Sequence, residues 1–90
     1  MAQVLAERPR RSITATTAPQ PDGIELTLDM TGLDRVDVYL DSRPRHTLDL
    51  TDGRHVLSVA VGGPGQYTLD VRRFFSGELA AQRRIAFTFG

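Results

Sequence analysis

The chain has 90 residues, no cysteine, and eleven basic residues balanced by eleven acidic ones. That length makes one domain, and the lack of cysteine excludes a disulfide framework and a thiolate-bound metal. The balanced charge gives no basic field for nucleic acid, and no stretch is apolar enough for a membrane span or a signal peptide. We therefore expect cytoplasmic synthesis, with neither a nucleic acid nor a membrane as partner.

Residues 1–11 are expected to form an N-terminal arm ahead of a single domain at 12–90. Every basic residue of the chain is an arginine, and Arg8, Arg10 and Arg11 gather in this arm against one acid. Two interpretations remain open for this cluster. It is either a solvated tail or a segment that docks on an acidic surface of a protein partner.

Apolar residues alternate with polar ones through the rest of the chain, which predicts β-strands with one buried face. The clearest example is Ile24, Leu26, Leu28 and Met30, which are separated by Glu, Thr and Asp. Seven strands are expected, at 12–18, 24–30, 35–41, 46–51, 55–61, 66–75 and 79–89. Their number and spacing predict an all-β fold, a seven-stranded antiparallel sandwich of two sheets.

One pair of strands is expected to form a hairpin around Asp52-Gly53, a dipeptide typical of two-residue turns. In that register Leu48 lies opposite Leu57, and the large apolar residues of both strands, except Val56, share a face. Strands 46–51 and 55–61 are therefore predicted to be neighbours in one sheet. Ahead of them, the segment around Pro44 is expected to end the third strand, because proline cannot donate a hydrogen bond to a β-ladder.

The last two strands are also expected to pair, and their alternation constrains the loop. Both strands place odd-numbered residues inward, so the loop needs an odd number of residues. A three-residue loop at 76–78 meets this condition, with glycine supplying a left-handed conformation. The resulting register places Leu69 opposite Ile85, and Asp70 opposite Arg84 as an outward pair of opposite charge.

A Gly-Gly-Pro-Gly corner at 62–65 is followed by Tyr67, which opens the sixth strand. A tyrosine just past such a corner resembles the tyrosine corner of immunoglobulin-like and fibronectin type III-like sandwiches. The resemblance covers residues 12–90 and implies that the Tyr67 hydroxyl bonds a backbone group within 61–64. The expected hairpin at 52–53 favours the constant-type strand order over the fibronectin order, in which the fourth strand joins the third. The chain departs from the family in having neither a cysteine pair nor a tryptophan.

Residues that could carry chemistry are few and scattered. His46 and His55 are expected about 13 Å apart along the hairpin, too far to share a zinc ion. Asp37 and Asp41 have a similar separation, beyond that of glycosidase carboxylates. No nucleophile motif or calcium-loop spacing is present. We therefore expect no enzymatic activity and no cofactor.

The third, sixth and seventh strands are expected to share a sheet whose outward side is a contact surface. The outward residues are Asp37, Tyr39, Asp41, Asp70, Arg72, Phe74, Ala80, Gln82 and Arg84. Because tyrosine and arginine are enriched at interface hot spots, protein binding is assigned to Tyr39, Arg72, Phe74 and Arg84, together with the arginines of the arm.

The expected function is that of a non-catalytic structural or interaction module that acts by surface contact in a larger assembly. Its architecture resembles accessory proteins of tailed-phage virions, such as capsid decoration and tail proteins. That resemblance implies a capsid or tail protein as partner and the virion as location. The alternative is a carbohydrate- or cell-surface-binding module, which would need an exposed aromatic platform in a chain without tryptophan.

Overall fold

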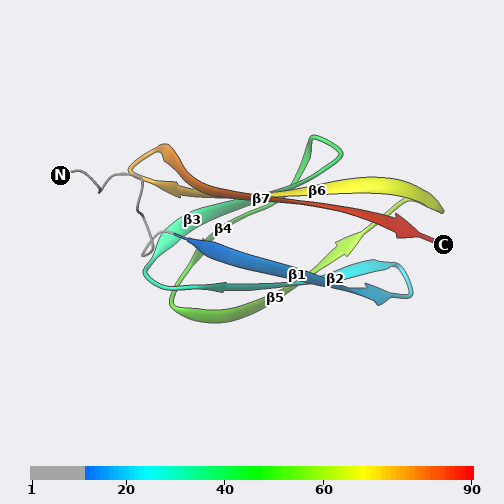
Figure 1. Cartoon of the computed structure of the whole chain (residues 1–90), viewed down its shortest axis with the longest axis horizontal. Helices are drawn as coiled ribbons and strands as arrows, with labels where there is room; N and C mark the ends of the chain where they lie inside the picture. Colours follow the sequence, from blue (N-terminus) through cyan, green and yellow to red (C-terminus); the bar gives the residue numbers. More distant parts are fainter. Residues whose placement is uncertain (1–11) are drawn as a thin grey trace.

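The computed structural model describes residues 12–90, which form seven β-strands (Figure 1). The strands are β1 (Ile13–Gln20), β2 (Gly23–Met30), β3 (Asp34–Leu40), β4 (Arg43–Leu50), β5 (Gly53–Ala60), β6 (Gly65–Phe75) and β7 (Glu78–Phe89). Each lies within a few residues of its expected bounds. The predicted arm, with Arg8, Arg10 and Arg11, lies outside the described residues. Among residues 12–90 there is no helix long and apolar enough to cross a membrane.

The seven strands form two antiparallel sheets that pack face to face (Figure 1). The three-stranded sheet has the order β1-β2-β5, and the four-stranded sheet has the order β4-β3-β6-β7. Between them lies one core of aliphatic side chains, to which strands of both sheets contribute. The predicted fold, an all-β sandwich of two antiparallel sheets, is confirmed.

The predicted hairpin around Asp52-Gly53 is wrong, and with it the expected constant-type strand order. β4 pairs with β3, and β5 pairs with β2, so the two strands lie in different sheets. The observed order is the one given above as the fibronectin-type alternative. At Asp52-Gly53 the chain instead crosses between sheets, and the Asp52 carboxylate accepts a hydrogen bond from the backbone N–H of Gly32.

The hairpin that does form joins β3 to β4 through Asp41-Ser42. Both residues have positive φ, 49° and 70°, which is the geometry of the type I′ turn favoured in two-residue hairpins. Asp41 fixes this turn on β6, because its backbone N–H donates to Thr68 O at 2.9 Å and its Oδ1 accepts from Thr68 N at 2.8 Å. Pro44 therefore does not interrupt the β-structure but lies within β4. It lies on an edge strand, next to a β-bulge at which Arg45 has no opposite residue, as expected for proline in a sheet.

The β6–β7 hairpin has the predicted register but not the predicted loop. Leu69 lies opposite Ile85 and Asp70 opposite Arg84, as expected. The turn, however, is the two-residue Ser76-Gly77, again with positive φ at both residues. A bulge at Ala80 supplies the extra residue that the alternation requires.

The tyrosine corner is confirmed. The Tyr67 hydroxyl donates to the carbonyl oxygen of Gly63 at 2.5 Å, within the predicted segment. Its ring stacks on Phe87 with centroids 5.6 Å apart. The hydrogen bond and the ring stack together tie the β5–β6 crossover to β6 and β7.

Candidate interaction surface

The outward side of the four-stranded sheet carries a continuous array of arginine, aromatic and carboxylate side chains. Pairing across β3, β6 and β7 places Tyr39 beside Asp70 and Arg84, and Asp37 beside Arg72 and Gln82. We call the following eight residues the arginine–aromatic face: Arg35, Asp37, Tyr39, Asp70, Arg72, Phe74, Gln82 and Arg84.

Asp70 is the centre of the hydrogen bonds on this face. Its Oδ2 accepts from Arg72 Nε at 3.0 Å and from Arg72 Nη2 at 2.9 Å. Its Oδ1 accepts from Gln82 Nε2 at 2.9 Å. Arg84 Nε is farther away, at 3.9 Å from Oδ2. Charge-assisted bonds of this kind are roughly twice as strong as neutral ones, so Asp70 and Arg72 hold each other in place.

Two arginines also cover aromatic rings. The guanidinium carbon of Arg72 lies 4.5 Å from the centre of the Tyr39 ring, and that of Arg35 lies 4.3 Å from the centre of the Phe74 ring. Both distances are within the range of cation–π attraction. Each guanidinium therefore has a fixed position above β3 or β6.

The second carboxylate of the face, Asp37, is less well satisfied. Its Oδ1 lies 3.3 Å from Arg35 Nε, close enough for an ion pair. This oxygen is nonetheless buried and makes no hydrogen bond to any residue of the described part of the chain. An unsatisfied buried acceptor is costly, so Asp37 is a weak point of the face.

The charged side chains of this face lie at two depths. The side chains of Asp37 and Asp70 are only 12% and 11% exposed, whereas those of Arg72, Arg35 and Arg84 are 34%, 47% and 69% exposed. A molecule that approaches this sheet meets guanidinium groups first, with the carboxylates beneath them.

An open hollow lies at one end of the face, next to the β3–β4 turn. Its volume is about 420 Å³. It is lined by Asp41, Ser42, Thr68, Asp70, Arg72 and Arg84. Every lining side chain is polar or charged, which suits a polar group of a partner better than an apolar one.

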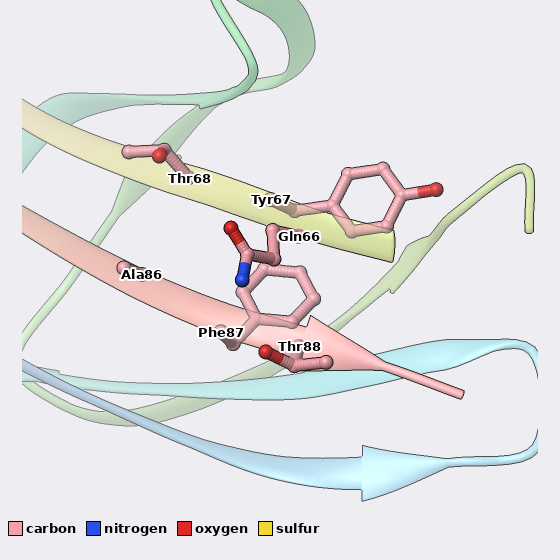
Figure 2. A pocket seen from close by; sticks show the side chains of 6 residues that line it. All are labelled: Gln66, Tyr67, Thr68, Ala86, Phe87 and Thr88. Carbon is pink, nitrogen blue, oxygen red and sulfur yellow. The ribbon is translucent and has the colours of Figure 1, made fainter. Parts of the chain in front are cut away.

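A second hollow, of about 430 Å³, lies over β6 and β7 near the C-terminal end of β7 (Figure 2). Its lining consists of Gln66, Tyr67, Thr68, Ala86, Phe87 and Thr88. Figure 2 shows the Tyr67 hydroxyl pointing away from the other labelled side chains, and this hydroxyl is already bonded to Gly63. With no ionisable side chain other than this tyrosine, the hollow offers little chemistry.

The structure brings four of the sequence-predicted site residues together: Tyr39, Arg72, Phe74 and Arg84. The three arginines of the arm lie outside the described residues. Two residues expected on the outward side depart from it, since Asp41 lies in a turn and Ala80 lies at a bulge. The prediction missed Arg35, although its spacing of two from Asp37 already places it on the same side of the strand.

The two histidines lie on different sheets, and neither belongs to the arginine–aromatic face. His46 lies on β4, where its Nε2 is 3.0 Å from Ser58 O, and His55 lies on β5, where its Nε2 is 2.8 Å from Thr51 O. Within residues 12–90, no group of three or more histidine, cysteine, aspartate or glutamate side chains is arranged to hold a metal ion.

Comparison with known proteins gives one structural likeness. No protein-family model matches the chain, and no curated protein matches it. The structure is similar to part of the spore cortex lytic enzyme SleM of Clostridium perfringens, with a TM-score of 0.63 and 10% sequence identity. The match covers 97% of this chain and 31% of that enzyme, so the chain spans about a third of its length. At this identity the likeness shows the fold alone.

Proposed function

We propose that this protein is a non-catalytic interaction module that binds a protein partner through the arginine–aromatic face. The observation that carries this proposal is the pair of guanidinium groups held over Tyr39 and Phe74 on the outside of a sheet. The inward side of that sheet already buries the core. Ordered arginine and aromatic side chains that the core does not need are the residue types on which interface hot spots depend.

The outer side of the other sheet supplies an internal comparison. It consists of Thr14, Thr16, Ala18, Glu25, Thr27, Asp29, Arg54, Val56 and Ser58, by the pairing of β1, β2 and β5. This side has no aromatic residue and one ion pair, Arg54 with Asp29 at 3.4 Å. Both sides face outward from the sandwich, so an outward position alone does not account for the difference between them.

A carbohydrate- or cell-surface-binding module is the second candidate. The observation in its favour is that the same fold occurs within a spore cortex lytic enzyme. Against it, sugar recognition by aromatic residues needs a bare ring face, and guanidinium groups lie over the rings of Tyr39 and Phe74. We therefore prefer a protein partner.

The test compares a face variant with a matched control. The face variant combines Tyr39→Ser, Phe74→Ser and Arg72→Glu, and the control carries Arg54→Glu and Val56→Ser on the opposite sheet. Melting temperatures establish first that both variants fold. Each protein is then immobilised and exposed to candidate assemblies, including phage capsid and tail proteins and isolated cell wall, and any retained protein is purified and titrated against all three chains.

A partner retained by the wild type and the control, but not by the face variant, supports the proposal. Equal binding by all three chains would contradict it and would direct attention to the arm and the ends of the sandwich. Retention on cell wall with the same dependence on Tyr39 and Phe74 would favour the carbohydrate-binding alternative.

A further inference from the structure

We infer that the partner of the arginine–aromatic face is an acidic protein segment, whose carboxylates compete with Asp70 for Arg72 and Arg84. This inference rests on the proposed function and adds the chemistry of the partner. Its basis is the depth difference on the face, where the arginine side chains are partly or largely exposed and the aspartates lie beneath them.

Arg84 is the cation best placed to receive a partner's carboxylate. Its side chain is 69% exposed, and at 3.9 Å from Asp70 Oδ2 it forms an ion pair without a hydrogen bond. Within residues 12–90 it donates no hydrogen bond of the kind that Arg72 makes. A guanidinium has five N–H donors in a planar fork that matches a carboxylate, and those of Arg84 are unused on this side of the sheet.

Arg72 adds further donors on the same side of the hollow. It uses its Nε and Nη2 groups on Asp70, which leaves the remaining guanidinium N–H groups for a second acceptor. Stacking on Tyr39 holds it in place, so little side-chain entropy is lost when a ligand binds. The hollow beside these two arginines, of about 420 Å³, has room for a carboxylate side chain.

The charges around the face favour a short acidic segment over a long polyanion. Residues 12–90 contain eight arginines and ten acidic residues, a net charge of −2. On edge strand β4, exposed Arg43 and Arg45 accompany Asp49, which lies opposite Arg35. Nucleic acid binding usually depends on many phosphate contacts along a basic track. The three arginines of the face, Arg35, Arg72 and Arg84, are too few for such a track. They suit local pairing with a few carboxylates instead.

The experiment uses a fluorescein-labelled hexaglutamate peptide as the probe, with hexalysine and a hexathymidylate as charge and class controls. Binding to the full chain is measured by anisotropy, and its location by the Nε–Hε and backbone amide signals in ¹H–¹⁵N spectra. We expect hexaglutamate to shift the Arg72 and Arg84 signals, and its affinity to fall as salt rises. Arg84→Glu should reduce binding at least fivefold, whereas Arg54→Glu should leave it unchanged.

Asp70→Asn provides the sharper test, because it removes the internal competitor while keeping an acceptor for Arg72. It should raise the affinity for hexaglutamate about two- to fivefold, the range expected for one partly exposed charge pair. Asp29→Asn is the matched control, since it likewise removes the carboxylate beside an exposed arginine. It should leave the affinity unchanged.

Several results would overturn the inference. They are unchanged or weaker hexaglutamate binding by Asp70→Asn, an equal gain from Asp29→Asn, binding of hexalysine at the face, and tighter binding of hexathymidylate at the same arginines. None of these affects the capture experiment, in which the face is tested without regard to the charge of the partner. If the face variant loses its partner while hexaglutamate fails to bind, the proposed function stands and the acidic partner is refuted.

Discussion

Replacing Arg73 by methionine should destabilise the fold more than any change on the arginine–aromatic face. Arg73 lies on the inward side of β6 and is completely buried. Its Nε donates to Asp34 Oδ2 at 2.8 Å, its Nη1 to Ser12 O at 2.6 Å, and its Nη2 to Thr31 O. One side chain thus joins β6 to the first residue of β3, the residue after β2 and the residue before β1, at the end of the sandwich where the β6–β7 turn lies (Figure 1).

The size of the effect follows from what the substitution leaves behind. Removing one partner of a buried ion pair costs about 3–5 kcal/mol, because the other charge remains buried without its counter-charge. At roughly 0.05–0.15 kcal/mol per residue, a chain of this length has a total stability of about 5–13 kcal/mol. Arg73→Met should therefore remove a large share of it. Arg73→Lys should fall between methionine and the wild type, since lysine keeps the charge but lacks the planar fork that reaches three acceptors.

The assay is equilibrium unfolding in urea, followed by circular dichroism, with the midpoint and slope compared among variants. Arg54→Met is the matched control, because Arg54 also pairs with an aspartate but is 71% exposed. An exposed pair of this kind contributes at most about 1 kcal/mol. If Arg73→Met unfolds at the same urea concentration as Arg54→Met, the buried ion pair does not hold the sandwich end together and the reasoning is refuted.

Three further predictions concern the turns and the arm. Tyr67→Phe should cost about 1–2 kcal/mol, because it leaves Gly63 O without its bond; an unchanged urea midpoint would show that the bond contributes nothing. Asp41→Ala should lower the melting temperature more than Asp41→Asn, since only asparagine keeps an acceptor for Thr68 and tolerates positive φ; equal losses would argue against that role. Deleting residues 1–10 should leave the fold intact and weaken partner binding most at low salt; an unfolded product would place those residues in the core.

Hydrophobic alternation predicted which side of each strand is buried, but it did not identify each strand's neighbours. Leu48 and Leu57 illustrate the limit. Both were expected to face inward from one sheet, and both do pack against the core, but from opposite sheets. Two facing sheets satisfy the same pattern as one hairpin, so the alternation could not distinguish them. The hairpin that distinguishes the two arrangements turns at Asp41-Ser42, where two residues that are not glycine adopt positive φ. No glycine marked this turn in the sequence.

Arg73 was missed for a related reason. The alternation of Tyr67, Leu69 and Val71 already places residue 73 inward, and arginine there contradicts the rule that buried positions are apolar. Its partners are one carboxylate and two backbone carbonyls from three other segments, which only the folded chain brings together. By contrast, the arginine–aromatic face could be predicted in outline, because alternation alone assigns the outward residues of β3, β6 and β7 and the β6–β7 register was predicted correctly.

The two edge strands of the four-stranded sheet, β4 and β7, bear on where the proposed partner would bind. An exposed edge strand invites strand addition by another chain, and natural sheets oppose this with proline, bulges and charge. Edge strand β4 carries Pro44 beside a bulge, and edge strand β7 carries the bulge at Ala80 and two consecutive arginines, Arg83 and Arg84. Both edges are thus poor templates for a new strand. This agrees with our proposal that a partner binds the outward side between them, where the guanidinium groups lie.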